Sequence, residues 1–199
     1  MPPDADIDSM RRAVQGCEGC DLYRNATQAV FGEGDANAVV MLVGEQPGDR
    51  EDIEGHPFVG PAGRLLDRAL EEAGIERSRV YITNAVKHFK WEARGKRRIH
   101  KKPSAGEVAA CGPWLEAEIA AVGPRTIVCL GATAAQSLLG ATFRVSRQRR
   151  EVMKRSDGRN VVATVHPSSI LRAPDEESRA LEYQEFVADL QEVARTLQR

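Results

Sequence analysis

Four apolar runs of strand length are spaced along the chain. They are Ala38–Val43, Val80–Thr83, Thr126–Leu130 and Val161–Val165. Each is rich in β-branched residues and lacks the apolar–polar alternation of a half-exposed strand. Continuous runs of this kind are typical of strands buried on both faces of a parallel sheet. The pattern therefore predicts four parallel strands.

After the first run the apolar positions change to a helical period. Leu65, Leu66, Ala69 and Leu70 share one face of a helix that Gly74 would end. Strands that alternate with helices imply a doubly wound sheet with right-handed crossovers.

Caps and composition predict the remaining elements. Ser104-Ala-Gly-Glu107 matches a capping box and opens a long helix, which Pro113 should kink unless it lies within the first turns. Short helices are expected at Met10–Val14 and Gly131–Gly140. A basic, hairpin-like segment is expected at Phe143–Asn160, and a final surface helix from Asp175 onward.

The composition suits one domain spanning residues 1–199, with enough apolar content for a real core. No apolar run approaches the ~20 residues that span a bilayer. The acidic start, Met1-Pro-Pro-Asp4, lacks the features of a secretory signal. We therefore expect a monomer in a reducing cytoplasm, without membrane association.

Polar or small residues follow every predicted strand: Glu45 and Gln46, Asn84, Gly131–Thr133, and His166–Ser169. Ligands of open α/β sheets bind outside the carboxyl ends of the strands, so four loops should converge on one site. Each residue also has a structural interpretation. Glu45 could cap its loop, Asn84 could bridge backbone groups, and His166 could be an ordinary structural histidine.

Other residues near these loops are open to two interpretations. Phe58, in a loop rich in glycine and proline, could be core or a stacking platform. His56 and His88 are taken as structural. No segment matches a P-loop or a dinucleotide fingerprint, which disfavours nucleotide cofactors.

A basic segment at about residues 90–102 follows the second strand. Lys87–Lys102 contains eight Lys or Arg residues and one acid, Glu92, although the whole chain has a net charge of −1. Such a segment could be a solvated loop or could bind a polyanion. His100 is its one residue suited to covalent or acid–base chemistry at neutral pH.

The four cysteines are Cys17, Cys20, Cys111 and Cys129. In a reducing compartment disulfides are not expected. Cys17-Glu-Gly-Cys20 has the spacing that lets two thiolates face one metal, whereas the other two are far apart. Spacing alone leaves structural zinc, an iron–sulfur cluster and unligated thiols open.

Taken together, these motifs resemble the uracil-DNA glycosylase superfamily, specifically the iron–sulfur family 4 enzymes and most closely their UdgX-type branch. Gly44-Glu-Gln-Pro-Gly48 resembles the first glycosylase motif, Gly60-Pro-Ala-Gly-Arg64 its helix entry, and His166-Pro-Ser-Ser169 the second motif. The resemblance covers nearly the whole chain. It implies a three-layer α/β/α fold with a central four-stranded parallel sheet, and a [4Fe–4S] cluster held by Cys17, Cys20, Cys111 and Cys129.

Two departures from family 4 match the UdgX-type branch. Gln46 replaces the usual alanine, and the basic loop containing Lys96-Arg-Arg-Ile-His100 is inserted. The resemblance implies excision of uracil from single-stranded and possibly double-stranded DNA. His100 would then attack C1′ and join the protein covalently to the abasic site.

The same resemblance implies a role for each site residue. Glu45 would orient or activate His100, and His166 would stabilise the leaving uracil. Substrate contacts are expected from Gly44, Gln46, Phe58, Asn84 and Ser168, and DNA contacts from Lys96, Arg97, Arg98, Lys101, Lys102 and a second patch at Arg144–Arg150. Bound to DNA, the protein would associate with the nucleoid.

Two alternatives remain open. The chain could be a conventional turnover glycosylase whose basic loop only clamps DNA. It could also be an iron–sulfur module that binds damaged DNA without cleavage.

Overall fold

A computed structural model describes residues 6–197 and contains a five-stranded sheet in the order β2-β1-β5-β7-β6. The strands are β1 (Val40–Gly44), β2 (Val80–Asn84), β5 (Thr126–Leu130), β6 (Met153–Lys154) and β7 (Asn160–Thr164). Pairing of β2, β1, β5 and β7 is parallel, which confirms the four predicted strands. The short β6 adds an antiparallel edge by pairing with β7. The predicted hairpin-like segment at residues 143–160 is therefore only partly a hairpin, because it also contains the short helix α6 (Val145–Gln148).

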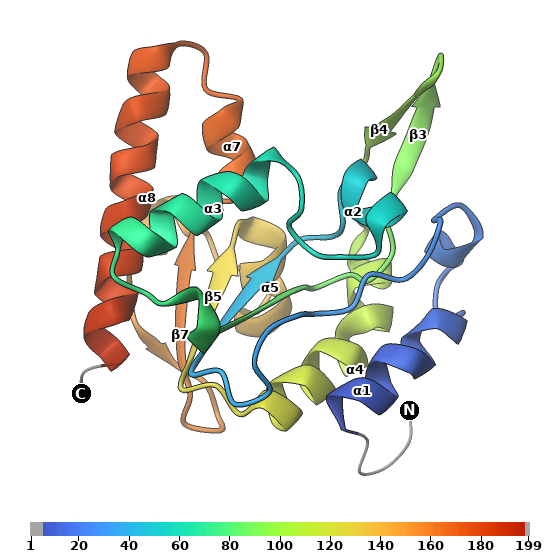
Figure 1. The fold of residues 1–199 in the computed structure, drawn as a ribbon, viewed down its shortest axis with the longest axis horizontal. Coiled ribbons are helices and arrows are strands. Elements are labelled where there is room, and N and C mark those ends of the chain that lie inside the picture. Colours follow the sequence, from blue (N-terminus) through green and yellow to red (C-terminus); the bar gives the residue numbers. More distant parts are fainter. Residues whose placement is uncertain (1–5, 198–199) are drawn as a thin grey trace.

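Helices cover both faces of the sheet (Figure 1), which confirms the predicted three layers. One face packs on α3 (Pro61–Glu72), α7 (Pro167–Leu171) and α8 (Glu176–Leu197). The other face packs on α4 (Ala105–Val122) and α5 (Ala132–Leu139). Successive strand residues alternate between these two cores, as expected for strands buried on both sides.

The helix ends follow the sequence signals. Both hydrogen bonds of the capping box between Ser104 and Glu107 are present at the start of α4. Helix α3 ends with Ala73 as its C-cap, and the predicted glycine, Gly74, follows it with a positive φ of 73°. Helix α4 continues through Pro113 to Val122. The shorter helices are α1 (Ile7–Ala13), α2 (Asp49–Glu54) and α6 (Val145–Gln148), with 3₁₀ turns at Val14–Gly16, Asp21–Arg24 and Arg77–Arg79.

The predicted basic loop is a β-hairpin. Its strands β3 (Trp91–Arg94) and β4 (Arg97–His100) pair antiparallel as a separate two-stranded sheet. Gly95, with φ of 62°, allows the tight turn between them. In Figure 1 this hairpin projects from the body beside α2.

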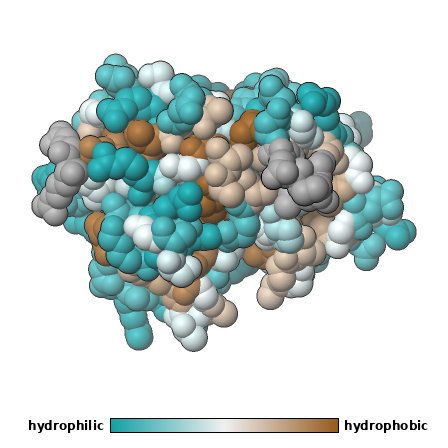
Figure 2. Space-filling view, turned by 90° about the horizontal axis from the view of Figure 1, so that it is seen from below, coloured by the Kyte–Doolittle hydropathy of each residue, from teal (hydrophilic) through white to brown (hydrophobic). Residues whose placement is uncertain are grey.

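The end of the molecule away from the hairpin has a mixed surface. Hydrophobic residues there lie in small patches between hydrophilic ones (Figure 2). Among the described residues, no helix is both long and apolar enough to cross a membrane.

Candidate active site

A cavity of about 610 Å³ lies at the carboxyl ends of the four parallel strands. Side chains from all four strand ends and from the hairpin line it. Of the residues expected at the site, it collects Glu45, Gln46, Phe58, Asn84, His100, Lys102, His166 and Ser168. The predicted convergence of four loops is therefore what the fold produces.

Asn84 supplies an unpaired acceptor at this site. It ends β2, opposite Gly44 of β1, and its side chain is 2 % exposed. Its Oδ1 is buried without a hydrogen-bond partner in residues 6–197. A Cβ atom on Gly44 would lie 2.3 Å from this oxygen and 2.8 Å from Cζ of Phe58. Gly44 thus leaves room for both groups, and the free acceptor calls for an N–H donor from a ligand.

Phe58 forms one wall beside His166. The two rings stack with centroids 5.8 Å apart and an interplanar angle of 26°. Phe58 has φ of 57°, a left-handed conformation that is unusual for an aromatic residue. The chain packs tightly there, since a Cβ on Gly63 would lie 1.5 Å from the Phe58 carbonyl oxygen. Such strain persists where the surroundings enforce it, often at functional sites.

His166 is held as a neutral imidazole. Its Nδ1 accepts the Ser168 backbone N–H at 3.1 Å and lies 2.7 Å from the Ser168 hydroxyl oxygen. Burial lowers the pKa of His166 to about 4. With Nδ1 as an acceptor, the proton of the neutral ring lies on Nε2. Ser168 therefore acts on His166, although it also lines the cavity.

His100 lies beside Glu45 at the cavity rim. The distance from His100 Nε2 to Glu45 Oε1 is 3.3 Å, and the Thr133 hydroxyl donates to Glu45 Oε2. Burial alone would raise the pKa of Glu45, but hydrogen bonds from His100 and Thr133 outweigh it and lower this pKa. Glu45 is therefore an ionised acceptor that can orient the imidazole.

Gln46 lines the cavity and also joins both ends of the hairpin. Its Oε1 accepts the Lys90 backbone N–H at 3.0 Å, and its Nε2 donates to the carbonyls of Lys90 at 3.2 Å and Lys101 at 3.1 Å. The side-chain amide is thus engaged within the protein, and the predicted substrate contact of Gln46 stays a prediction. Its position fixes the two chain segments on either side of β3 and β4.

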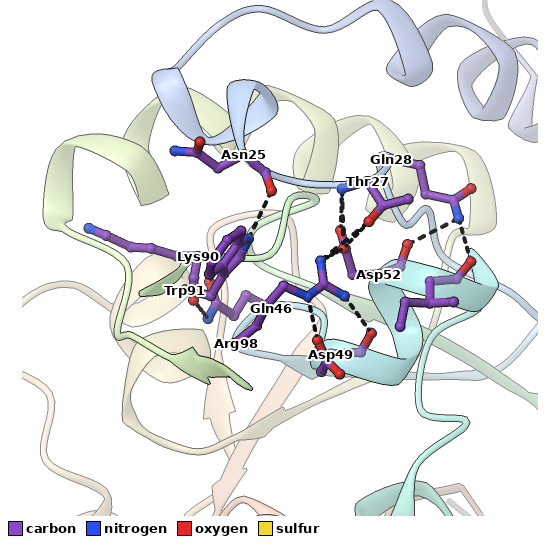
Figure 3. A network of polar contacts seen from close by, with 10 residues as sticks. Asn25, Thr27, Gln28, Gln46, Asp49, Asp52, Lys90, Trp91 and Arg98 are labelled. Carbon is purple, nitrogen blue, oxygen red and sulfur yellow. Dashed lines mark hydrogen bonds and ion pairs between the residues drawn. The ribbon is translucent and has the colours of Figure 1, made fainter. Parts of the chain in front are cut away.

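Arg98 is likewise a structural contact rather than a free DNA-binding residue, as Figure 3 shows. Its Nη1 lies 2.6 Å from Oδ2 of Asp52, and its Nε lies 2.6 Å from Oδ1 of Asp49. Asp52 is fully buried and also accepts the Thr27 N–H and hydroxyl. Nearby, the Trp91 indole N–H donates to the Asn25 carbonyl at 2.8 Å. These contacts tie the hairpin to α2 and to the segment that follows Cys20.

The other cationic side chains of the hairpin differ in whether an ion pair within the protein already occupies them. Lys96 and Arg97 are exposed at the tip, and no ion pair to them is found within residues 6–197. Lys101 pairs with Glu92 at 3.0 Å, and Lys102 lines the cavity.

The predicted second basic patch is partly neutralised. Arg149 and Arg150 both pair with Asp189 of α8, and Arg150 also pairs with Glu185. Paired guanidinium groups are less able to bind phosphates, so DNA contacts at residues 144–150 are restricted to the remaining cations.

Three of the four cysteines lie near one another. Burial raises the pKa of Cys111 to about 11, and the neighbouring Cys20 and Cys17 thiols also act to raise it. The Lys87 backbone N–H donates to Cys111 Sγ at 3.2 Å, and the Trp114 indole N–H donates to Cys17 Sγ at 3.2 Å. Hydrogen bonds to sulfur stabilise metal-bound thiolates, so this environment fits a metal cluster.

Cys129 contradicts the predicted four-cysteine ligand set. It lies in the middle of the sheet, fully buried in the apolar core beneath α4 and α5, and burial raises its pKa to about 12. The physical reason is that β5 is buried on both faces, so Cys129 lies in one of the two cores, whereas Cys17 and Cys20 are partly exposed. Within residues 6–197, no group of three or more metal-binding side chains is arranged for direct coordination.

His88 is a candidate ligand that the sequence interpretation missed. It follows Lys87, whose N–H contacts Cys111, and it is 5 % exposed with no hydrogen bond to its ring in the described chain. Burial lowers the pKa of His88, which favours the neutral form that binds metals. Its place directly after the Asn84 loop was the available signal.

Comparisons with known proteins agree with the geometry. Residues 31–191 match the family described as the uracil DNA glycosylase superfamily. The chain is 39% identical over 169 residues to a type-4 uracil-DNA glycosylase of Thermotoga maritima, with 84% of each chain covered. It is 37% identical over 175 residues to the type-4 enzyme of Archaeoglobus fulgidus, again with 84% of each covered. The family match contains every candidate residue of the cavity.

Proposed function

The chain belongs to the uracil DNA glycosylase superfamily, and from this premise we propose that it excises uracil from DNA and is then joined covalently to the abasic sugar through His100. The relatives' activity and the cavity support the excision. The contact between His100 and Glu45 at the cavity rim is the observation that carries the covalent step.

The base would be recognised after it leaves the DNA stack. Asn84 Oδ1, buried without a partner, would accept the uracil N3–H, while its amide N–H would donate to O4. Cytosine presents the opposite pattern at these two atoms, so the amide discriminates against it. Phe58 supplies an aromatic face on which the ring would stack.

Excision breaks the bond between C1′ and N1, and the bonding electrons leave with uracil. His166 would donate from Nε2–H to the charge that develops on uracil O2, since its Nδ1 is engaged by Ser168. The sugar becomes an oxocarbenium-like cation. An imidazole lone pair of His100 would form the new bond to C1′, and Glu45 would accept the proton of the other ring nitrogen.

We also propose a [4Fe–4S] cluster held by Cys17, Cys20, Cys111 and His88, with Cys129 outside the ligand set. Such a cluster cross-links chain segments that are distant in sequence, and nothing in the mechanism above requires electron transfer. Iron content and visible absorption test this assignment. His88→Ala should lower both, whereas Cys129→Ala should leave both at the wild-type level, and the reverse result would restore the four-cysteine set.

The covalent step is tested on a denaturing gel with uracil-containing single-stranded DNA. Wild-type protein should give a slowly migrating adduct. His100→Ala should give none and should instead release uracil with turnover. His56→Ala is the matched control, because His56 is exposed and pairs with Glu33 away from the cavity lining. Catalytic release of free abasic DNA by the wild type would overturn the proposal.

A conventional turnover glycosylase is the second candidate. The exposed cations Lys96 and Arg97 at the hairpin tip favour it, because they would clamp DNA without any covalent chemistry. In that case His100→Ala would leave product release unchanged, and changes at the tip would weaken binding in a salt-dependent way.

A further inference from the structure

A second cavity of about 550 Å³ adjoins the active site. It is a groove between the first half of α4 and the helix α5, and we call it the α4–α5 groove. Lys102 and Thr133 line both cavities, so the groove continues directly from the site of excision. We propose that the α4–α5 groove binds the base of the nucleotide next to the excised uracil in single-stranded DNA. This inference rests on the proposed function.

The walls of the groove suit a flat, mainly apolar group. Small residues of α4 and the loop after α5, among them Ala105, Ala109, Gly112 and Ala141, leave it open. Val108 and Leu115 supply apolar surface. Its volume is within the range of about 300–1,000 Å³ that is usual for ligand pockets. A Cβ added at Gly112 would meet nothing within 4 Å, so this wall is open space rather than packed core.

The charge at the shared boundary suits the phosphate that links two nucleotides. Lys102 lies there, and no ion pair to it is found within residues 6–197. Thr133, in the first turn of α5, lies at this boundary, and Ala105, in the first turn of α4, lines the groove. The interior also contains polar side chains, among them Glu116, whose carboxylate is paired with Arg155. A cationic mouth and a mainly apolar interior match a nucleotide with its phosphate outside and its base inside.

The groove also has a backbone group that can accept a hydrogen bond. Pro113 lies inside α4 and has no N–H, so the carbonyl of Ala109 lacks its usual helical donor. Ala109 lines the groove. An exocyclic amino group of a base could supply this donor.

A neighbouring base bound in the groove would also make the protein prefer single-stranded to double-stranded DNA. In a duplex, the neighbouring base is stacked and paired, and it can enter a protein groove only after leaving the helix. In a single strand the base is free to turn away, so the groove favours single-stranded DNA.

The test compares Gly112→Leu with Gly106→Leu. Both glycines are in α4 with open space at Cβ, but only Gly112 lines the groove. Leucine is also a better helix former than glycine, so neither change should harm folding. The substrates are uracil oligonucleotides with either a normal base or a tetrahydrofuran spacer at the 5′ or the 3′ neighbour. The single-turnover rate of base release is measured with protein in excess over the DNA but below the concentration that saturates binding.

Loss of the neighbouring base on one side should slow the wild type by about tenfold, in line with the stacking energy of one base. Gly112→Leu should show a similar loss on the normal substrate and no further loss on that spacer. Gly106→Leu should behave as the wild type. Equal rates for Gly112→Leu and wild type, or wild-type indifference to both spacers, would overturn the proposal.

If the proposed function is wrong, the result is different: neither the wild type nor either variant would release uracil from any of the substrates. The anisotropy of a fluorescent single-stranded oligonucleotide then still tests the groove. Weaker binding by Gly112→Leu than by Gly106→Leu would support it, and equal binding would refute it.

Discussion

The pocket and the hairpin are held in place by different means. Asn84 ends a central parallel strand and His166 follows another, so backbone pairing and both cores fix their positions. The hairpin has two strands of four residues, mostly exposed and outside the main sheet. It depends on side-chain contacts from Gln46, Asp49 and Asp52. The residues proposed to recognise the base are therefore fixed by the main sheet, whereas His100 lies on a hairpin whose anchoring contacts can be weakened separately.

The support beneath Asn84 illustrates the difference. Lys87 Nζ donates to the Asn84 carbonyl at 2.7 Å and pairs with Glu118, and both charged side chains are fully buried. Glu118 also accepts the Tyr81 and Thr83 hydroxyls. In contrast, the Arg98 side chain that anchors the hairpin is 21 % exposed. Changes to the pocket should stop excision. Changes to the side chains that anchor the hairpin should first reduce formation of the covalent adduct.

Asn84→Leu should have the largest effect. It removes the amide that is proposed to read the base, and the leucine methyl groups would meet the N3–H and O4 of uracil. We expect excision to fall by about 10³-fold or more, as for other lost transition-state or recognition hydrogen bonds. Base release from uracil DNA measures this, with urea unfolding to check that stability is retained. Near-wild-type excision would show that the pocket does not read uracil through Asn84.

Arg98→Leu should reduce formation of the covalent adduct while uracil excision continues. It leaves the buried Asp52 without its cationic partner, which should cost about 2 kcal/mol of hairpin stability for a lost charged hydrogen bond. Adduct yield should fall while released uracil persists. Arg97→Leu, one residue away but exposed, is the matched control and should keep the adduct. If both variants retain full adduct yield, the Arg98 contacts do not position His100.

The same contrast explains what the sequence could predict. Strand runs and the residues that follow them located Glu45, Asn84 and His166, because parallel strands bring their carboxyl ends to one edge of a sheet. The partners of Gln46 and Arg98 depend on tertiary contacts between segments more than 40 residues apart, which no local pattern encodes.

The cysteines show a similar limit. Spacing identified the Cys17–Cys20 turn, but it could not show which core Cys129 faces. Alternation along a strand buried on both sides places one residue in each core in turn, and both cores are apolar here. His88 was missed for another reason: it lies in the loop after β2, and its place there was a signal too weak to separate a metal ligand from a structural histidine.

Gln46→Ala should have a smaller effect than Arg98→Leu. It removes the hydrogen bonds to both ends of the hairpin but leaves no buried charge. A loss of about 1.4 kcal/mol would slow adduct formation by about tenfold. Time courses on denaturing gels give this rate, and uracil release gives the excision rate in parallel. An equal loss in both rates would show that Gln46 supports the pocket as well as the hairpin.

The smallest effect should be that of pH on excision, measured in His100→Ala so that only the pocket imidazole is followed. Burial lowers the pKa of His166 to about 4. The neutral ring, which donates from Nε2 while Nδ1 accepts the Ser168 N–H, therefore persists as pH falls until about pH 4. Excision should change by less than about twofold between pH 8 and pH 5 and decline below that, because protonated Nδ1 can no longer accept. A decline centred near the ordinary histidine value of 6.5 would mean that His166 is more exposed to water than the pocket geometry implies.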